Sequence, residues 1–427
     1  MERLIKPAKN VRGEISLPGD KSIWHRALII GAISEGETEI TGEPAGDDVS
    51  STESCLRQLG IKISRENGKT FVSGNGATGL KKPDSVLDAG NSGTTLRLLS
   101  GVLAAQQFES VIDGDSSLRS RPMSRIVTPL SLMGADLIPS DSGGCPLSIR
   151  GSTNLKPISY NSPIASAQVK SAMILASICS GVELELSEPY PSRNHTEIML
   201  RQCGVNIQTE GNSIRMERNV KLKGAVFRVP GDFSSAAFFI TAALMLPDSE
   251  ITLKNVGLNP TRTGFLNVLK RMGADIRVIP DENGSGEKQG DIVVRSSDLK
   301  AVTITAEDVP SIIDELPLIG ILGTVADGVT NVSGAFELRV KESDRISLLI
   351  KGLQKIGISA NEFEDGFSVE GGQKISGGTV DAGNDHRIAM SFAIAGLASE
   401  KGVTLKGAES ASVSYPSFFS DLEKLSE

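Results

Sequence analysis

The chain is poor in the residues that metal centres, disulfides and membrane spans require. Its 427 residues include four cysteines, three histidines and one tryptophan. The cysteines form no C-x-x-C pair and the histidines lie far apart, so we expect no disulfide framework, no metal site and no cofactor. No apolar run is long enough to cross a bilayer, and the N-terminal stretch MERLIKPAKN lacks the apolar core of a signal peptide. These absences predict a cytoplasmic protein with no membrane partner.

Positive charge is also not in excess. The 44 Lys and Arg residues are outnumbered by 52 Asp and Glu residues, which gives a net charge of −8. This balance excludes a general nucleic-acid surface, so any cluster of cations is a local feature. The length corresponds to about two domains, and 39% hydrophobic and 22% charged residues are ordinary for a globular enzyme.

One short pattern recurs along the chain: Leu, two residues, an apolar residue and then Gly. Its six copies are spaced about seventy residues apart, and the last has Ser in place of Gly. Each copy is typical of the end of an amphipathic helix with glycine as its left-handed cap. Alternating, strand-like sequence generally follows. The copies are Leu56–Gly60, Leu130–Gly134, Leu200–Gly204, Leu269–Gly273, Leu353–Gly357 and Leu422–Ser426.

The other half of each repeat is a small-residue loop followed by a mostly apolar helix, which must be buried. The whole repeat therefore predicts a strand, a buried helix, a strand, a surface helix and two strands. We expect an α/β protein with six such βαβαββ repeats, three in each domain. The loops begin at Gly19, Gly90, Ala165, Gly231, Asp308 and Gly383.

Two of these loops echo each other, LPGD at 17–20 and VPGD at 229–232. We interpret them as the places where the chain crosses between domains. The first domain would be discontinuous, combining residues 1–20 with 231–427, and the second would span 21–230. Buried helices whose N-termini face one interdomain cleft would bind anions through their backbone N–H groups. We expect the active site in that cleft.

Cationic residues gather at or near the predicted loops. Planar Arg suits bidentate binding of phosphate or carboxylate, whereas Lys acts as a point charge. So many cations indicate several anionic groups, as in a pair of small phosphorylated or carboxylated substrates. Arg97 and Lys170, taken alone, fit a solvated surface charge equally well. The cations are Lys21, Arg26, Arg97, Arg119, Arg121, Lys170, Arg193, Arg339, Lys341, Arg345 and Arg387.

Acidic residues accompany these cations. Asp314 and Glu315 lie in the apolar stretch VPSIIDELPLIG, which we expect to be a helix, where an ionised pair is costly without a partner. Glu342 follows Lys341, and an acid beside an amine is a candidate for general acid–base catalysis. Other chemistries find no support. GDKS lacks the Gly that a phosphate loop has before its Lys, and neither H-E-x-x-H nor G-x-S-x-G occurs.

Eight stretches, in the same order as in the family and spread over the chain, resemble the EPSP synthases (3-phosphoshikimate 1-carboxyvinyltransferases). Several of them look more like the class II bacterial branch than the enteric one. The stretches are LPGDKSIWHRA, GNSGTTLRLLSG, GDSSLRSRPM, ASAQVKSAMILA, PSRNHTEIML, IDELP, LRVKESDRI and DAGNDHRIAMSFAIAGL.

The resemblance implies a two-domain inverse α/β barrel, the enolpyruvyl transferase fold. It also implies transfer of the enolpyruvyl group of phosphoenolpyruvate to the 5-hydroxyl of shikimate 3-phosphate, which releases phosphate. This is a step in the synthesis of chorismate and aromatic amino acids, and the family is the target of glyphosate. The partners would be these two small molecules, without nucleic acid, and the protein would be a monomer.

Carried over position by position, the resemblance implies a role for each site residue. Asp314 would accept a proton, Glu342 would donate one, and Lys341 would share in the transfer. Shikimate 3-phosphate would be held by Lys21, Ser22, Arg26, Ser166, Gln168, Arg193, Asp314 and Lys341. Phosphoenolpyruvate would be held by Lys21, Gly93, Arg121, Gln168, Arg345 and Arg387. Gly93 would let the backbone approach its ligand closely because it has no Cβ.

Trp24 departs from the family pattern, because a small polar residue usually occupies this position. Its indole could narrow the phosphate pocket or pack outward. Two other functions are also open. A UDP-N-acetylglucosamine enolpyruvyltransferase would share fold and donor, but that family carries a reactive Cys near SSLRSRP, and this stretch has none. A catalytically inactive phosphate-binding protein could use the same scaffold, although Asp314, Lys341 and Glu342 argue against it.

Overall fold

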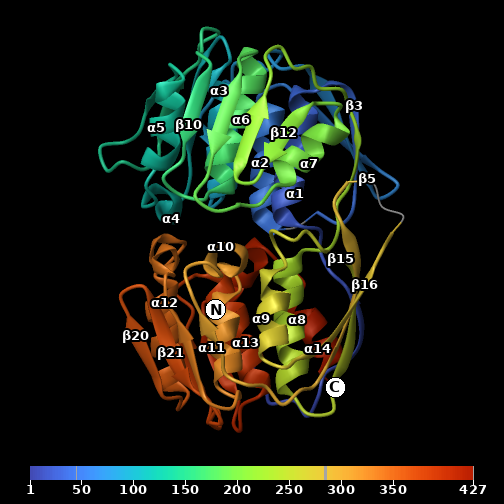
Figure 1. The fold of residues 1–427 in the computed structure, drawn as a ribbon, viewed down its shortest axis with the longest axis vertical. Helices are drawn as coiled ribbons and strands as arrows, with labels where there is room; N and C mark the ends of the chain where they lie inside the picture. Colours follow the sequence, from blue (N-terminus) through green and yellow to red (C-terminus); the bar gives the residue numbers. More distant parts are fainter. Residues whose placement is uncertain (45, 283–285, 427) are drawn as a thin grey trace. The chain divides into compact units, whose positions relative to one another are not determined.

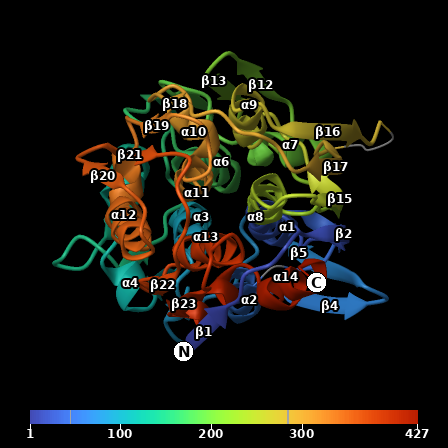
Figure 2. The same cartoon turned by 90° about the horizontal axis from the view of Figure 1, so that it is seen from below.

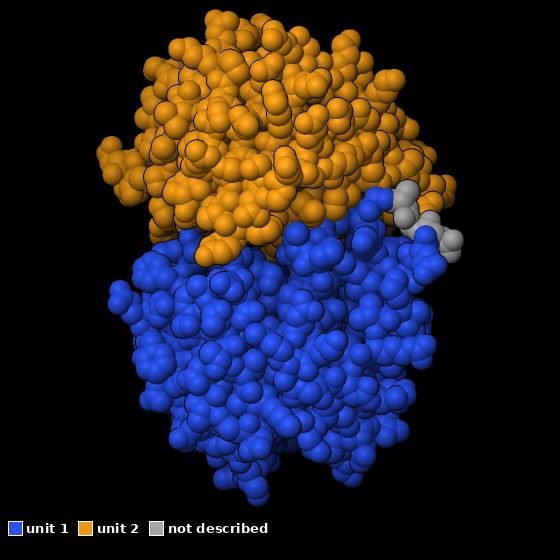
Figure 3. All heavy atoms as spheres, viewed as in Figure 1, with its two compact units in different colours: residues 1–18, 230–427 blue, residues 19–229 orange. Residues whose placement is uncertain are grey.

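The computed structural model describes residues 1–44, 46–282 and 286–426. The chain forms two compact units (Figure 3), which are described separately. Unit 1 comprises Met1–Pro18 and Pro230–Glu427, and unit 2 comprises Gly19–Val229. Each unit has its own hydrophobic core. The chain changes unit within the LPGD and VPGD loops.

Unit 2 contains seven helices within its described residues. They are α1 (Lys21–Ile33), α2 (Gly46–Gln58), α3 (Gly93–Ala104), α4 (Ser116–Arg119), α5 (Ser124–Leu132), α6 (Ala167–Ser180) and α7 (His195–Gln202). The strands are β3 (Glu35–Thr41), β4 (Lys62–Glu66), β5 (Lys69–Asn75), β6 (Leu87–Asp88), β7 (Glu109–Asp113), β8 (Asp136–Ile138), β9 (Leu147–Arg150), β10 (Ile158–Asn161), β11 (Leu184–Ser187), β12 (Ile207–Glu210), β13 (Ser213–Met216) and β14 (Val226–Arg228).

Unit 1 contains the remaining elements. Its helices are α8 (Phe233–Met245), α9 (Gly264–Arg271), α10 (Val309–Ile312), α11 (Leu316–Gly323), α12 (Arg345–Lys355), α13 (His386–Leu397), α14 (Phe418–Leu425) and the 3₁₀ helices η1 (Phe336–Val340) and η2 (Ala408–Val413). Its strands are β1 (Glu2–Ile5), β2 (Arg12–Ser16), β15 (Glu250–Gly257), β16 (Asp275–Pro280), β17 (Gln289–Arg295), β18 (Thr303–Ile304), β19 (Val329–Val332), β20 (Ala360–Phe363), β21 (Gly366–Glu370), β22 (Gly378–Asp381) and β23 (Val403–Lys406).

The strands repeat one sheet plan. In the sheet β6-β7-β9-β8, the parallel strands β6 and β7 are connected along the chain by helix α3. Strand β9 pairs antiparallel with both β7 and β8. The sheets β10-β11-β13-β12 and β18-β19-β21-β20 follow the same order. In Figures 1 and 2 the strands lie around the long helices of each unit. The α/β class and the repeating strand–helix–strand–helix–strand–strand order agree with the sequence prediction.

Two sheets contain a strand that is distant in sequence. β14 pairs parallel with β3 in the sheet β14-β3-β5-β4, and β2 pairs parallel with β15 in the sheet β16-β17-β15-β2. The strand that precedes each of the helices α1 and α8 along the chain thus belongs to the other unit's sheet. The sixth repeat also differs from the prediction, because after β23 it has no strand pair of its own. Within the described residues, the N-terminal strand β1 pairs with β23 in its place.

The predicted glycine caps are confirmed. Five of the six helices that end in the recurring pattern are followed by a glycine with φ between +83° and +91°, the left-handed conformation that favours glycine. These are Gly60, Gly134, Gly204, Gly273 and Gly357.

The loops ahead of the long buried helices carry the helix caps. The side chains of Asp20, Ser92, Ser166, Asp232 and Asp385 accept hydrogen bonds from backbone N–H groups in the first turns of α1, α3, α6, α8 and α13. These caps satisfy N–H groups that have no partner within the helix.

One predicted helix is interrupted. Asp314 and Glu315 do not lie inside a continuous helix, because α10 ends at Ile312 and α11 begins at Leu316. Pro317 stands in the first turn of α11, where the missing N–H is not needed. The acidic pair therefore occupies the turn between the two helices, where Glu315 is the residue that precedes α11.

Among the helices of the described residues, none combines the length and the apolar character that a membrane span requires.

Candidate active site

In unit 1, the starts of α8, α11 and α13 meet through their side chains. Ser234, in the first turn of α8, donates a hydrogen bond to the Glu315 carboxylate ahead of α11. Arg387, at the start of α13, lies 3.9 Å from the same carboxylate. Three helix N-termini, each with free N–H groups and partial positive charge, thus gather at one place in this unit.

Arg345 is the central cation of this group. Its side chain is 2% exposed and contacts three carboxylates. Its Nε lies 2.9 Å from Asp385, one Nη 2.6 Å from Glu342 and the other 3.5 Å from Asp314. Burial by itself would lower the pKa of Arg345, but the three carboxylates together raise it. The contact with Arg345 holds the pKa of Asp385 below its ordinary value, although burial acts to raise that pKa. Arg345 therefore stays charged, and Asp385 stays ionised.

Two more guanidinium groups approach Asp314. Arg262 lies 3.8 Å and Arg387 4.0 Å from its carboxylate, and both are buried. Arg262 also contacts Asp232 at 3.0 Å and donates to Ser234. We call Asp314, Glu315, Glu342 and Asp385, with Arg262, Arg345 and Arg387, the acid–arginine cluster. An anion that bound its arginines would take over contacts that the carboxylates now make.

Two further groups of this region, Glu315 and Lys341, have perturbed pKa values. Burial raises the pKa of Glu315, despite the nearby charge of Arg262. Burial also lowers the pKa of Lys341, while the charges of Asp314 and Glu337 act in the opposite direction. A lysine with a lowered pKa and a carboxyl with a raised one are both closer to neutral pH, as groups that transfer protons need to be.

In unit 2, the starts of α1, α3 and α6 meet in the same way. Gln168, in the first turn of α6, donates to the hydroxyl of Thr94 in α3 at 3.0 Å and accepts from Arg97 at 2.6 Å. Arg26 of α1 donates to Ser171 of α6 at 2.8 Å. The first two turns of these three helices are therefore linked directly by side chains.

Lys21 and Arg26 lie on α1 but have different partners. Lys21 forms an ion pair of 2.8 Å with Asp48 of α2. Arg26 is 3% exposed and donates to the hydroxyls of Thr196 and Ser171 and to the carbonyl of Ser22. Its guanidinium is thus oriented by neutral oxygens of three helices.

Gly93 is the first residue of α3, and two arginines flank it. A Cβ at this position would lie 3.1 Å from Arg97 Nη1 and 3.3 Å from Arg121 Nη1. Arg121 donates to Asn91 at 2.8 Å, which fixes its head group beside this turn. Because glycine leaves the space open, the backbone N–H groups at the start of α3 lie beside both guanidinium groups.

Ser166 and Arg193 lie in the loops before α6 and α7. The Ser166 N–H donates to Glu188 at 2.8 Å, and Ser192, next to Arg193, donates to the same carboxylate at 2.7 Å. We call the residues just described at or beside the starts of α1, α3 and α6, together with Arg193, the hydroxyl–cation cluster. Its members are Lys21, Ser22, Arg26, Gly93, Thr94, Arg97, Arg121, Ser166, Gln168, Ser171 and Arg193.

The sequence-predicted residues thus divide between the two units. Lys21, Ser22, Arg26, Gly93, Arg121, Ser166, Gln168 and Arg193 belong to unit 2, and Asp314, Lys341, Glu342, Arg345 and Arg387 to unit 1. Two other cations serve elsewhere. Arg119 pairs with Asp113 at an exposed position, and Arg339 pairs with Asp344 and Glu362.

Sequence reasoning missed several partners of these residues. Asp48, Glu188, Arg262 and Asp385 contact predicted site residues, and Asp232 contacts Arg262, but none of the five was singled out. Asp232 and Asp385 had a recognisable signal, since both precede a buried helix in a G-D or N-D turn, as Asp20 does. Asp48 and Arg262 carry no such signal, because only the fold brings them to Lys21 and Asp314.

Trp24 and His25 are core residues of α1. Trp24 is 1% exposed, and its indole N–H donates to the carbonyl of Glu43 at 3.0 Å. It therefore does not pack outward to solvent. His25 is buried and lies 2.6 Å from Thr52 Oγ1 through its Nδ1. Burial, together with the charges of Lys21 and Arg26, lowers the pKa of His25, so it is neutral at pH 7.

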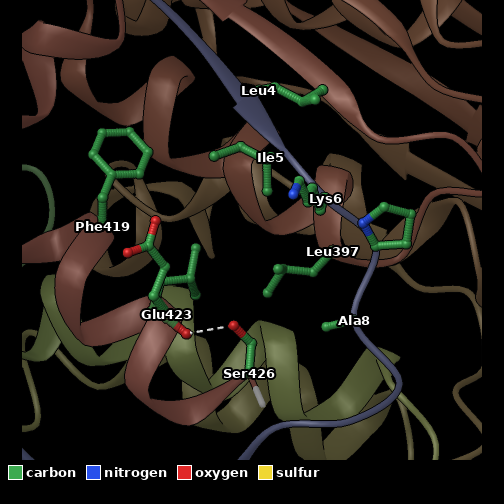
Figure 4. Close-up of a pocket in the computed structure, with 10 residues that line it drawn as sticks. Leu4, Ile5, Lys6, Ala8, Leu397, Phe419, Glu423 and Ser426 are labelled. Atoms are coloured by element: carbon green, nitrogen blue, oxygen red, sulfur yellow. Dashed lines mark hydrogen bonds between the residues drawn. The ribbon is translucent and has the colours of Figure 1, made fainter.

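A separate pocket of unit 1 has no lining residue that belongs to either cluster (Figure 4). It has a volume of about 380 Å³ and lies between the N-terminal strand, the end of α13 and helix α14. Leu4, Leu397, Phe419 and Leu422 line it, together with Lys6 and Glu423. None of the sequence-predicted site residues contributes to it. The described part of the chain also holds no group of three or more His, Cys, Asp or Glu side chains arranged to bind a metal ion.

The fold and the two clusters define an enzyme for small, multiply charged anions, with acid and base groups placed among the cations. Comparison with known proteins identifies the family. Residues 5–422 match the sequence profile of EPSP synthase (3-phosphoshikimate 1-carboxyvinyltransferase). The chain therefore belongs to the EPSP synthase family.

Individual relatives agree over their full length. The 3-phosphoshikimate 1-carboxyvinyltransferase of Thermoanaerobacter sp. is 45% identical over 425 residues and covers 100% of both chains. That of Petrotoga mobilis is 47% identical, covering 99% of this chain and 98% of its own. The solved structure of EPSP synthase from Acinetobacter baumannii has a TM-score of 0.88 at 43% identity and covers 100% of this chain and 98% of its own. The resemblance drawn from the sequence motifs is confirmed, and so is the prediction of an enolpyruvyl-transferring enzyme of the shikimate pathway.

Proposed function

We propose that the chain transfers the enolpyruvyl group of phosphoenolpyruvate to the 5-hydroxyl of shikimate 3-phosphate. The products are 5-enolpyruvylshikimate 3-phosphate and phosphate. The observation that carries this proposal is that the sequence-predicted residues collect at two groups of helix N-termini, where cations, backbone N–H groups and two acids can act on anionic substrates.

The binding roles follow the two clusters. Ser22, Arg26, Ser166, Gln168 and Arg193 hold shikimate 3-phosphate through unit 2, and Lys341 and Asp314 contact it from unit 1. Gly93, Arg121 and Gln168 hold phosphoenolpyruvate through unit 2, and Arg345 and Arg387 hold it through unit 1. Lys21 contacts both substrates. Two anions that repel each other are thereby placed side by side, which supplies both positioning and charge stabilisation.

The proton transfers use the acids of unit 1. Asp314 accepts the proton of the 5-hydroxyl as its oxygen attacks C2 of phosphoenolpyruvate. Glu342 donates a proton to the methylene carbon, and Lys341, whose pKa burial lowers, shares in the transfer. The tetrahedral intermediate then loses phosphate from C2 and a proton from the new methyl group, which Glu342 takes back, and the enol ether forms. Arg345 remains charged throughout, because carboxylates surround it, and it can stabilise the anionic groups.

A phosphate-release assay tests this proposal. We expect phosphate release to require both substrates, with shikimate 3-phosphate as the acceptor. A catalytically inactive binding protein would bind shikimate 3-phosphate without releasing phosphate. UDP-N-acetylglucosamine in place of shikimate 3-phosphate tests the related acceptor. Phosphate release with UDP-N-acetylglucosamine but not with shikimate 3-phosphate would contradict the proposal.

A single substitution separates catalysis from binding. We expect Glu342→Gln to lower kcat by about 10²-fold or more, because it removes the proton donor, while both KM values change little. Glu362→Gln is the matched control, since Glu362 pairs with Arg339 at an exposed position away from the cluster. A kcat equal to that of the unchanged protein would remove Glu342 from proton transfer.

Several features of the family resemblance form part of the same proposal. We propose that both clusters act on one substrate pair, in an interdomain cleft that closes when both substrates bind. Small-angle scattering with shikimate 3-phosphate and an unreactive donor analogue would show a smaller radius of gyration if this is right. A monomeric state, a cytoplasmic location, the class II affinity and glyphosate as an inhibitor also belong to the proposal.

A further inference from the structure

A buried group of three ionisable side chains lies beneath the loops before α6 and α7. Lys170 of α6 lies 3.0 Å from Glu188 and 2.9 Å from Glu197 of α7. The exposed fractions of the three side chains are only 5%, 3% and 2%. None of the three belongs to the substrate-binding residues proposed above.

Glu188 uses both carboxylate oxygens to connect two loops. One oxygen accepts from the backbone N–H of Ser166 at 2.8 Å. The other accepts from the hydroxyl of Ser192 at 2.7 Å and contacts Lys170. Lys170 also donates to the backbone carbonyl of Ser192 at 3.3 Å. One loop ends in Ser166, the cap of α6, and the other continues directly into Arg193.

The arrangement is costly as a purely structural device. Two carboxylates face one ammonium group in the core, and the second oxygen of Glu197 has no hydrogen-bond partner among the described residues. Burying ion pairs costs desolvation energy that their attraction often does not recover. What the arrangement does achieve is geometric, because it fixes the distance between the two loops beyond the point where the pairing of β10 with β11 ends, at Asn161 and Ser187.

We propose that Glu188 is a positioning residue for shikimate 3-phosphate. Through Ser166 and Ser192, it sets the spacing between Ser166 and Arg193, the two ligands that these loops present, while Lys170 and Glu197 hold its carboxylate in place. This inference rests on the proposed function of the two loops. It assigns Glu188 no contact with substrate and no part in proton transfer.

The choice of variant separates the bridge from the charge. Glu188→Ala removes both loop hydrogen bonds and leaves Lys170 paired with Glu197. Glu188→Gln removes the charge and the contact with Lys170, because the oxygen that faces Lys170 becomes an amide nitrogen. Its amide oxygen can still accept from the Ser166 N–H and its amide nitrogen can donate to the Ser192 hydroxyl, so both loop hydrogen bonds remain. Ser192→Ala removes only one side of the bridge. Glu53→Ala is the matched control, because Glu53 is also a buried carboxylate of unit 2 that pairs with two arginines, Arg57 and Arg65.

We expect Glu188→Ala to raise the KM for shikimate 3-phosphate by about tenfold or more, with the KM for phosphoenolpyruvate and kcat changed less than about threefold. Glu188→Gln should restore the KM to within about threefold of the unchanged protein, and Ser192→Ala should lie between the two. Glu53→Ala should leave both KM values unchanged. Melting temperatures measured alongside show which variants are folded, and if Glu188→Ala does not fold, Ser192→Ala decides.

Two results would overturn the inference. One is an unchanged KM for shikimate 3-phosphate in both alanine variants, and the other is an equal rise in the KM for both substrates. A Glu188→Gln variant as impaired as Glu188→Ala would assign the effect to charge and would also contradict the bridge. Titration of the Trp24 fluorescence with shikimate 3-phosphate alone repeats the comparison without catalysis. If the unchanged protein neither binds this compound nor releases phosphate, the proposed function fails; if it does both, only the bridge is in question.

Discussion

Gly93 stands where two guanidinium groups approach a single α-carbon. The side-chain atoms that a Cβ would meet belong to Arg97 and Arg121, and each is already held by a hydrogen bond to a neighbouring amide side chain. A methyl group here would displace these arginines by a few tenths of an ångström, and it would not strain the backbone, because φ is not positive at this residue.

We therefore expect Gly93→Ala to raise the KM for phosphoenolpyruvate by about tenfold, with a smaller effect on the KM for shikimate 3-phosphate. Steady-state kinetics with each substrate varied in turn measures this. Gly257→Ala is the control, because its Cβ would meet Pro230 at 3.3 Å, outside both clusters. Equal changes in the two KM values would contradict the placement of Gly93 beside phosphoenolpyruvate.

Lys341 should give the reaction an alkaline limit. Burial lowers its pKa from the ordinary lysine value of about 10.4. As the pH rises through this lowered pKa, Lys341 loses its proton and its charge, so kcat/KM for shikimate 3-phosphate should fall at a lower pH than an ordinary lysine would cause. In Lys341→Arg the limit should move to higher pH at a lower maximal rate, because guanidinium does not deprotonate in this range. A profile with the same alkaline limit in both proteins would assign it to another group.

At the level of residues, sequence could identify types of side chain but not their partners. Lys170 fitted a surface charge as well as a ligand when taken alone, and it proves to be a buried residue of an ion cluster. Its two partners come from a loop and from the next helix, so no local pattern contains all three. By contrast, Lys21 and Arg345 were found because each lies in a tight stretch of small residues beside a predicted buried element.

At the level of secondary-structure elements, the backbone conformation explains why glycine follows five of the six amphipathic helices. At Gly204 the φ angle is +83°, and no atom lies within 4 Å of the position of a Cβ. The glycine is therefore required for its left-handed conformation alone. At Gly60, where φ is +87°, an added Cβ would also lie 2.8 Å from the Lys81 side chain.

We expect Gly204→Ala to lower the free energy of unfolding by about 1 kcal/mol, and Gly204→Asn to lower it by less, because Asn tolerates the left-handed region better. Gly60→Ala should cost more than Gly204→Ala. Urea unfolding of the three variants measures the differences. If Gly204→Ala were as stable as the unchanged protein, the left-handed cap would have no energetic role.

The repeats were predictable because the amphipathic helix of five of the six is followed by a glycine at the same place. The break between α10 and α11 was not, because the stretch around Asp314 and Glu315 is apolar on both sides and its periodicity continues across the turn. Pro317 was the available signal, since proline favours the first turn of a helix and disfavours its interior. The sixth repeat could not be completed from its own sequence, because its third strand, β1, comes from the other end of the chain.

For the whole molecule, the two units differ in how they are assembled from the chain. Every sheet of unit 2 is built from strands between Gly19 and Val229. Unit 1 needs β1 and β2, which pair with β23 and β15 and so cover edges that would otherwise lack hydrogen-bond partners.

We therefore expect residues 19–229 to unfold cooperatively as an isolated fragment, whereas residues 230–427 should be poorly folded until a peptide of residues 1–18 is added. Circular dichroism and urea unfolding of the fragments, with and without the peptide, test this. A scrambled peptide of the same composition is the control. Cooperative unfolding of 230–427 alone, unaffected by the peptide, would contradict the structural role of β1 and β2.

The pairing of β1 and β2 with strands near the other end of the chain also affects the order of folding during synthesis. During translation, β1 and β2 leave the ribosome long before β15 and β23, so they must wait unpaired while the intervening segment emerges. All of unit 2 is made during that interval, and domains generally fold as units when they become available. We therefore expect the nascent chain to fold unit 2 before unit 1. The site residues at the start of α13 should reach their final geometry only when β23, the last strand of unit 1, has been made.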